Sequence, residues 1–349
     1  MSARSGQPKP VPDAAEPAAV LVYVGSDLVG DGLIKLPFVR ALRQTYPGTR
    51  ITWLAGEGRS AFSGALAPLV EALIDEIVDE IPAGTRLVDL LRSPLAGTVL
   101  AGRRFDLILD TQRGLLSTLA LRRIPHRLFV SATAGFLLSD RKPARPYHKP
   151  HSLARQLLDL VEVASGRPPP PFDPIQLDTR FERAADELLP PGPVYVGFAP
   201  GAGGRHKCWP RERFAELARR QHAHGRIPVF ILGPEEAAWA APLAQAVPGA
   251  AFPLQAPTAA RFEDSPMLTI TLAHRLAGSI TNDSGTGHML AIADRPLVFV
   301  FGPTSPEKFV PLHCAAEVVR AQEFGSSDMT AVPLEAVEAA LETALSRPA

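Results

Sequence analysis

The stretch Ser279–Pro311, SITNDSGTGHMLAIADRPLVFVFGPTSPEKFVP, contains two strand-like runs separated by a turn and a helix. Ser279–Thr281 has the small and β-branched residues of a strand end, and Leu297–Phe301 is an apolar run typical of a buried parallel strand. Between them, Asn282–Gly285 predicts a tight turn and Gly287–Ala293 predicts a helix. Because ligands in open α/β sheets bind at loops beyond the carboxyl ends of strands, we expect a binding site at this turn.

The start of this helix is suited to phosphate. A helix that opens in a small-residue turn presents free N–H groups and the positive end of its dipole. Ser284, Gly285, Thr286 and Gly287 can supply such amides without bulky side chains. The turn therefore predicts an anionic ligand.

A second loop, Phe198–Pro210 (FAPGAGGRHKCWP), carries a similar signal. Gly201 and Gly203, on either side of Ala202, let the backbone approach a ligand closely, and Lys207 adds a mobile positive charge. The spacing matches neither the Walker loop nor the G-x-G-x-x-G of dinucleotide sites. Trp209, which ends the loop, is interpreted as a packing residue. We expect this loop to face the first one across a phosphorylated ligand.

The composition is that of an ordinary globular protein. The 349 residues are 46% hydrophobic and 21% charged, and 36 basic residues balance 36 acidic ones, so the bulk charge gives no reason to expect a nucleic-acid partner. Cys208 and Cys314 form no disulfide framework and have no metal-ligand spacing, which favours a cytoplasmic location. No apolar run is long enough to span a bilayer, so any membrane contact is expected to be peripheral.

Strand-like and helix-like segments alternate on both sides of a Pro-rich run. Strands are predicted at 18–25, 50–54, 73–78, 105–110, 127–130, 194–198, 227–232, 279–281 and 297–301. Helices are predicted at 33–46, 59–66, 87–103, 113–122, 152–164, 211–224, 235–246, 268–277, 287–293 and 334–345. This pattern predicts an α/β protein with two doubly wound parallel sheets that face each other across a cleft. The last helix could pack on either of them.

The domain boundaries follow from composition. Residues 1–17 are polar and Pro-rich with no signal-peptide core, which predicts a disordered tail. Residues 18–165 are expected to form an N-terminal domain and residues 179–349 a C-terminal domain. The Pro-rich residues 166–178 are the predicted linker, because consecutive prolines fit neither a helix nor a central strand.

Several short motifs, taken together, resemble glycosyltransferase family 9, the ADP-heptose:lipopolysaccharide heptosyltransferases with the GT-B fold of two Rossmann-like domains. In the first half the motifs are Gly30-Asp31, Leu36-Pro37 and Tyr46-Pro47. In the second half they are Pro200-Gly201-Ala202, Lys207-Cys208-Trp209-Pro210, Asp283-Ser284-Gly285 with His288, and Phe301-Gly302-Pro303-Thr304 with Pro306. Their order and spacing, from about Val20 to Pro311, are specific for the family, though not for one acceptor.

The resemblance implies a role for each motif residue. Asp31 corresponds to the general base, and Lys207 corresponds to the lysine that holds the donor diphosphate. Glu236, or else Glu235, corresponds to an acid that contacts the donor nucleoside. The implied donor-binding residues are Gly201, Ala202, Gly203, Lys207, Glu236, Asp283, Ser284, Gly285 and His288. The chain departs from its relatives in two places, because the loop before Lys207 lacks their Ser or Thr and Gly32 replaces an apolar residue.

The implied chemistry needs these residue types. An acceptor hydroxyl must lose a proton as it attacks the anomeric carbon, and a carboxylate such as Asp31 is a natural base. The leaving nucleoside diphosphate needs fixed donors and a cation, which Lys207 and the amides of residues 284–287 can provide. Neither loop carries an Asp-x-Asp pair, so we expect metal-independent, inverting transfer, with an ADP-sugar as co-substrate and no cofactor.

Each residue also has a structural explanation that the sequence leaves open. Asp31 and Asp283 could each cap the helix that follows them. Lys207 could be a solvated loop lysine, and His288 could be a hydrogen-bonded core histidine. Glu235 and Glu236 stand where a helix dipole favours acids in any case.

The acceptor site is predicted from local basic charge. The segment Arg141–His151, RKPARPYHKPH, could bind the phosphates and carboxylates of a lipopolysaccharide inner core, or it could be a solvated loop. The predicted acceptor-binding residues are Lys35, Arg113, Arg145 and Lys149. Leu115–Leu121, followed by Arg122 and Arg123, hints at peripheral contact with the cytoplasmic face of the inner membrane.

The sequence therefore predicts transfer of a heptose from ADP-heptose to the lipopolysaccharide inner core. Alternatives that remain open are another nucleotide-sugar or glycan acceptor, a nucleotide-sugar epimerase of the same shape, and a non-catalytic nucleotide-sugar-binding protein.

Overall fold

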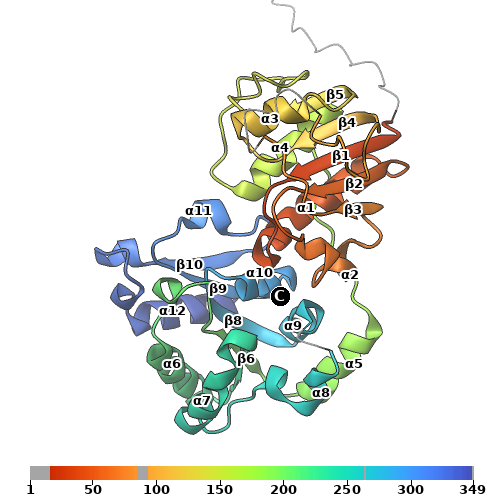
Figure 1. Ribbon diagram of the computed structural model, residues 1–349. Helices are drawn as coiled ribbons and strands as arrows, with labels where there is room; N and C mark the ends of the chain where they lie inside the picture. Colours follow the sequence, from red (N-terminus) through yellow and green to blue (C-terminus); the bar gives the residue numbers. More distant parts are fainter. Residues whose placement is uncertain (1–15, 85–92, 263–264, 348–349) are drawn as a thin grey trace, which may run out of the picture.

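The computed structural model describes residues 16–84, 93–262 and 265–347, and within them lie two separate five-stranded sheets. Both sheets are entirely parallel, with strand orders β3-β2-β1-β4-β5 and β10-β9-β8-β6-β7. Figure 1 shows the two sheets in different halves of the molecule, with helices packed around each. The predicted fold of two doubly wound α/β units is confirmed.

The strands have the following bounds. The first sheet contains β1 (Ala19–Val24), β2 (Arg50–Ala55), β3 (Glu76–Val78), β4 (Phe105–Asp110) and β5 (His126–Ser131). The second contains β6 (Tyr195–Ala199), β7 (Ile227–Phe230), β8 (Leu276–Asn282), β9 (Leu297–Phe301) and β10 (Ala316–Arg320). Every residue of β6 and β9 is buried, as expected of strands covered on both faces.

The helices alternate with these strands. In the first half they are α1 (Val29–Thr45), α2 (Ala67–Val70), α3 (Leu115–Leu121) and α4 (Leu153–Ser165), with a short 3₁₀ turn, η1, at Ala61–Ser63. In the second half they are α5 (Thr179–Leu188), α6 (Arg211–Ala223), α7 (Ala240–Ala246), α8 (Pro257–Ala260), α9 (Pro266–Ala273), α10 (Gly285–Ile292), α11 (Pro306–Phe309) and α12 (Leu334–Leu345). The remaining 3₁₀ turns are η3 (Arg205–Lys207), η4 (Pro234–Trp239), η5 (Pro253–Gln255), η6 (Ala321–Phe324) and η7 (Met329–Ala331).

In each sheet the connections reverse direction between two neighbouring strands. In the first sheet these are β1 and β4, and in the second they are β6 and β8. Loops that leave such a pair diverge to opposite faces and open a crevice at the carboxyl ends of the strands. The loops after β1 and β4 contain residues 25–28 and 111–114, and those after β6 and β8 contain residues 200–204 and 283–284.

The start of α1 differs from the prediction. The helix begins at Val29 and not at Leu33, so Asp31 lies in its first turn and is not its N-cap, which is Leu28. Glycines at positions 30 and 32 suggested a loop because glycine disfavours helix. Tertiary packing overrides this preference, since a Cβ on Gly32 would lie 2.8 Å from Leu66 Cδ1.

Other boundaries were also wrong. The predicted helix at 59–66 is a 3₁₀ turn followed by α2, and the strand at 73–78 is reduced to β3. Residues 93–103 form turns where a helix was expected, and the first part of that predicted helix, together with residues 1–15 of the predicted tail, lies outside the described residues. The helix at 235–246 begins as the 3₁₀ turn η4. The elements α5, β10 and α11 were not predicted.

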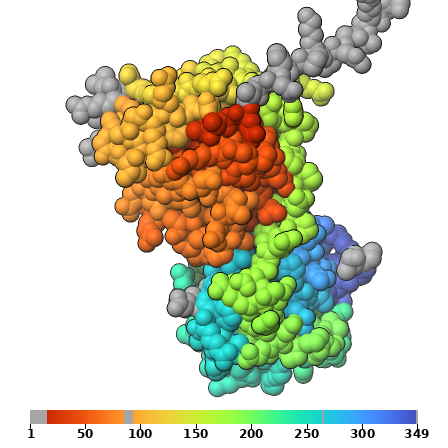
Figure 2. All heavy atoms as spheres, turned by 90° about the vertical axis from the view of Figure 1, so that its right-hand side faces the viewer, coloured from red at the N-terminus to blue at the C-terminus, as the bar shows by residue number. Residues whose placement is uncertain are grey.

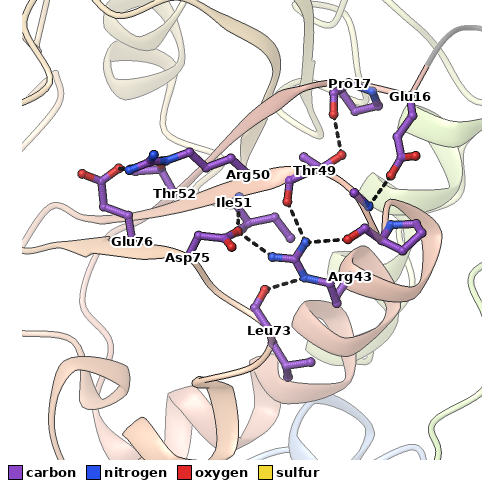
Figure 3. A network of polar contacts seen from close by, with 12 residues as sticks. Glu16, Pro17, Arg43, Thr49, Arg50, Ile51, Thr52, Leu73, Asp75 and Glu76 are labelled. Carbon is purple, nitrogen blue, oxygen red and sulfur yellow. Dashed lines mark hydrogen bonds and ion pairs between the residues drawn. The ribbon is translucent and has the colours of Figure 1, made fainter.

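A polar network fixes the far end of α1 (Figure 3). The Arg43 guanidinium donates to the carbonyls of Leu73, Pro47 and Thr49 and pairs with Asp75 at 2.6 Å. These contacts tie the last turn of α1 to the segments that lead into β2 and β3.

The two halves are connected along one side. Residues 168–178 form neither helix nor strand, and Figure 2 shows the yellow-green segment that follows α4 passing from one half to the other. Phe172 lies between the Arg40 guanidinium, 5.4 Å from its centroid, and the ring of His313, stacked at 4.4 Å. The last helix, α12, packs on β8, β9 and β10, so it belongs with the second sheet.

Candidate active site

A cavity of about 600 Å³ opens in the first half, at the switch point between β1 and β4. Its walls come from the ends of β1 and β4, the segments that follow β1, β2, β4 and β5, and the helices α1, α3 and α4. Asp31, Lys35 and Arg113, three residues predicted from sequence, line it. These three predicted residues thus share one cavity at the carboxyl ends of the strands.

Lys35 has a partner within the protein. Its ammonium lies 2.6 Å from Asp27 Oδ1, and Asp27 is 1% exposed. The other carboxylate oxygen accepts bonds from Trp53 Nε1 and Ser60 Oγ. Lys35 thus belongs to a buried ion pair that holds the loop after β1 against β2. The Asp27 carboxylate largely neutralises its charge.

The predicted acceptor residues are not gathered in one place. Arg113 lines the cavity and donates a 3.1 Å bond to the Tyr147 hydroxyl, which connects the cavity wall to the basic segment. Arg145 and Lys149 are exposed and do not line the cavity. The structure therefore favours Arg113 over the other basic residues as a contact for a ligand inside the cavity.

Sequence reasoning missed Asp110, which ends β4 and lines the cavity. Its carboxylate accepts bonds from the Gln112 amide at 2.9 Å, Thr118 Oγ1 at 2.6 Å and Ser131 Oγ at 2.9 Å. Burial raises the pKa of this carboxyl, although the hydrogen bonds oppose the shift. An acid as the last residue of an apolar strand, as in FDLILD, was the available signal.

In the second half, the two predicted loops lie side by side at the switch point between β6 and β8. Lys207 Nζ is 3.5 Å from Asp283 Oδ2, and the Asp283 side chain is 8% exposed. The N-cap of α10 is Ser284, whose Oγ accepts a bond from the Gly287 amide at 3.1 Å. Asp283 is therefore not the cap of this helix; its carboxylate faces Lys207.

The Glu236 side chain lies against Gly201, in the loop that follows β6. A Cβ at position 201 would lie 2.4 Å from Glu236 Oε1, so only glycine fits there without moving the carboxylate. Burial raises the pKa of Glu236, and the neighbouring Glu235 adds to the shift. Glu235 itself is exposed, so Glu236 is the acid of the pair that lies against Gly201.

Asn282 was read as a turn residue, but it is the fully buried last residue of β8. Its Oδ1 accepts a 3.0 Å bond from the Trp209 amide, and its Nδ2 donates to the carbonyls of Pro200 at 2.8 Å and Gly201 at 3.4 Å. Trp209 is 1% exposed and donates to the Val332 carbonyl, in agreement with its predicted packing role.

The two halves meet where α1 and α10 begin. A Cβ on Gly30 would lie 3.6 Å from Gly285 Cα, so the first turns of the two helices are in contact. His288, on α10, is 5% exposed, and burial lowers its pKa to about 4. The charges of Asp283, Asp31 and Lys207 all act on its ring. Residues predicted from both halves are thus brought together around a neutral histidine.

Among the described residues, none of the helices combines the length and the hydrophobicity that a membrane span requires. No group of three or more His, Cys, Asp and Glu side chains is arranged to hold a metal ion among the same residues.

Comparison with known sequences identifies the family. The family model described as glycosyltransferase family 9 (heptosyltransferase) matches residues 96–333. The chain belongs to this family. Lipopolysaccharide heptosyltransferase 2 of Salmonella typhimurium is 24% identical over 327 residues, which cover 86% of this chain and 87% of the relative.

Solved structures of family 9 enzymes share the fold. The structure of the Escherichia coli ADP-heptose lipopolysaccharide heptosyltransferase II covers 94% of this chain and 98% of its own, with a TM-score of 0.63 and 22% identity. A second E. coli heptosyltransferase, solved with ADP, covers 93% and 97% with a TM-score of 0.60, also at 22% identity. The chain is therefore a glycosyltransferase of family 9 with the GT-B architecture, as its motifs predicted.

Proposed function

We propose that this family 9 enzyme transfers a heptose from ADP-heptose to the inner core of lipopolysaccharide, with inversion and without a metal ion. The observation that carries the proposal is the contact between the first turns of α1 and α10. It brings Asp31, at the wall of the cavity, close to the donor loops that carry Lys207 and Asp283. An acceptor base and a diphosphate site in this arrangement suit glycosyl transfer.

The roles divide between the halves. Asp31 takes the proton of the acceptor hydroxyl as this oxygen attacks the anomeric carbon, and the bond to the diphosphate breaks. Lys207 and the amides of residues 284–287 stabilise the charge that develops on the leaving ADP. His288 is neutral near pH 7, since its pKa is about 4, and so adds no charge beside the base. Glu236 contacts the nucleoside.

The domain assignment follows from these roles. Residues 18–165 form the acceptor domain, residues 166–178 form the linker and residues 179–349 form the donor domain. The cavity of about 600 Å³ is large enough for more than one sugar ring. The Salmonella relative is named a lipopolysaccharide heptosyltransferase, which supports a glycolipid acceptor.

A lipid-anchored acceptor implies that the enzyme works at a membrane surface. Leu115 and Leu116 are 57% and 37% exposed at the start of α3, beside the cavity residues Gly114 and Ser117. We infer peripheral contact with the cytoplasmic face of the inner membrane through this end of the molecule. Co-sedimentation with anionic vesicles tests the contact, and unchanged binding by a double variant with Leu115 and Leu116 replaced by Ser would contradict it.

The function is tested by ADP release from ADP-heptose in the presence of EDTA, with and without an inner-core acceptor on lipid A. Release that depends on the acceptor supports the proposal. Saturable binding of ADP without release would indicate another sugar or another acceptor. Release without any acceptor, or conversion of the free nucleotide-sugar, would favour hydrolysis or the epimerase alternative. Absence of ADP binding would contradict the donor site.

A further inference from the structure

Asn282 is the one residue at the end of β8 whose side chain reaches both ends of the loop between β6 and α6, within the described residues. Its amide nitrogen donates to the carbonyls of Pro200 and Gly201, where the loop begins. Its amide oxygen accepts from the Trp209 amide, where the loop ends. The side chain is 0% exposed, so these bonds are made without competition from water.

The loop depends on such an external contact because its own sequence does little to fix its conformation. Residues 201–204 read Gly-Ala-Gly-Gly, and glycines leave the backbone free to adopt many conformations. At position 203 a Cβ would meet no atom within 4 Å, so no neighbouring side chain confines the backbone at this point of the loop. The 3₁₀ turn η3 follows directly and carries Lys207. Whatever fixes the ends of the loop therefore also fixes the position of Lys207.

The next residue in the chain, Asp283, completes the geometry. Lys207 lies two residues before Trp209, and Asp283 lies one residue after Asn282. The bond between Trp209 and Asn282 thus brings the two short segments together and keeps Lys207 Nζ 3.5 Å from Asp283 Oδ2. Because Asn282 is buried beneath the loop, it acts through other residues and touches no ligand.

We propose that Asn282 is the positioning residue of the donor diphosphate site. It holds both ends of the loop of residues 200–209 at the end of β8, and so sets where Lys207 and the loop amides lie. This inference rests on the function proposed above only in taking the loop as the diphosphate site. A neutral amide suits the position, because a carboxylate there would face two carbonyl oxygens and would add negative charge beside an anionic ligand.

The decisive comparison is between Asn282→Ala and Gln221→Ala. Gln221 is also 0% exposed and bonded to Glu342 and Arg226, but it lies at the far end of α6 and contacts α12. Both variants lose buried hydrogen bonds and should melt at lower temperature. Only Asn282→Ala should reduce donor kcat/KM, by about 10²-fold, since misplacement of about 1 Å costs this much. Its acceptor KM should stay near that of the wild type.

Binding of ADP alone, measured by calorimetry, is a second readout that needs no sugar or acceptor. Asn282→Ala should weaken ADP binding by about tenfold, the effect of roughly 1.4 kcal/mol. In the Asn282→Ala background, Lys207→Ala should cost less than it does in the wild type, because the two residues act on the same contact. Additive effects would show that Asn282 does not act through Lys207.

Asn282→Asp covers the case in which the alanine variant fails to fold. Aspartate has the same shape and keeps the acceptor for the Trp209 amide, but it cannot donate to Pro200 and Gly201. Because the added charge alone can weaken ADP binding, the proposal is supported only if Lys207→Ala costs less ADP affinity in a folded Asn282→Asp protein than in the wild type. Donor affinity equal to that of the wild type in either folded variant, or a loss no greater than that of Gln221→Ala, would overturn it. Failure of the wild-type protein to bind ADP would instead refute the proposed function.

Discussion

The two halves of the molecule place a site at the same topological position but build it differently. Between β1 and β4 the loops leave a cavity of about 600 Å³, lined by charged and polar side chains together with leucines of α4. Between β6 and β8 the loops pack on each other, with Glu236 against Gly201 and Lys207 against Asp283. A roomy cavity suits a large glycan, whereas backbone packed this closely suits a small, constant diphosphate.

The residues at the two strand ends show the same difference. Asp110 and Asn282 each accept or donate three hydrogen bonds and are almost wholly buried. Asp110 keeps an acid next to a cavity, and burial raises its pKa. Asn282 keeps a neutral amide under the loop that we assign to an anion. The same position in the fold thus carries an acid in one half and a neutral amide in the other.

The largest effect is expected from the contact between the halves. Asp31→Asn should lower kcat by about 10²- to 10⁴-fold, because the amide cannot take the acceptor proton. ADP binding should be unchanged, since the donor loops do not include this residue. Acceptor-dependent ADP release together with calorimetry checks both statements. A variant as active as the parent would show that Asp31 is not the base.

A smaller effect is expected from the donor loop. Lys207→Ala should weaken ADP binding by about 10- to 100-fold, as the loss of a charge-assisted contact of roughly 1.5–3 kcal/mol implies. Arg205→Ala, which removes a charge of the same sign from an exposed position two residues away, is the matched control. Equal losses in the two variants would mean that only the local charge matters and not the position of Lys207.

The cavity should respond separately from the donor loop. Arg113→Ala should raise the acceptor KM by about tenfold, an effect of roughly 1.4 kcal/mol, and leave ADP binding unchanged. Lys149→Ala, at an exposed position outside the cavity wall, should leave both unchanged. Steady-state kinetics with varied acceptor measures this. A change in donor affinity in Arg113→Ala would contradict the assignment of acceptor binding and donor binding to different halves.

The smallest effect concerns acid stability. Burial lowers the pKa of His313 from 6.5 to about 4, so the unfolded chain takes up its proton first and stability is lost as pH falls from about 6.5 toward 4. Between pH 7 and 5 the free energy of unfolding of His313→Phe, which keeps a ring against Phe172, should fall by about 1–2 kcal/mol less than that of the wild type. Melting curves at both pH values measure the difference; parallel losses would contradict it.

Asp110, which lines the cavity, should change the stability of the protein with pH in the opposite direction. The pKa of Asp110 is raised, so burial of its charged form costs stability above the ordinary range of a carboxyl, and acid relieves this cost. The wild-type protein should therefore gain stability from Asp110 as the pH falls, and Asp110→Asn should remove this gain. His313→Phe, by contrast, should remove a loss of stability. Variants that shift in the same direction would show that these groups do not control the acid response of their regions.

The accuracy of the sequence-based prediction depended on the kind of signal. Leu297–Phe301 and Leu334–Leu345 were predicted to the residue, because an unbroken apolar run and a clear helical period leave few alternatives. The start of α1 was wrong because propensity favoured a loop at its glycines, while packing against Leu66 decided otherwise. The strand β10 was missed because it lies at the edge of its sheet and its sequence, AEVVR, includes two charged residues and no unbroken apolar run.

The site shows the same limits. The motif residues of both halves were brought together, since loops at strand ends share an edge of their sheet. The pairing of Lys35 with Asp27 could not be foreseen, because a charged side chain eight residues from another has many partners open to it. Asn282 was hidden for a related reason. As a residue type it favours turns, and only the strand-end geometry turns its side chain under the neighbouring loop.

The chain completes its first sheet before it begins its second, and α12 packs on the sheet formed by the strands just before it. A single genetic crossover near residue 170 would therefore exchange one whole half between related genes without splitting a sheet. The new pair would have to match where α1 packs on α10, where α4 packs on α11, and at the ring of Phe172. Recognition of a new glycan could then evolve while the nucleotide site was inherited unchanged.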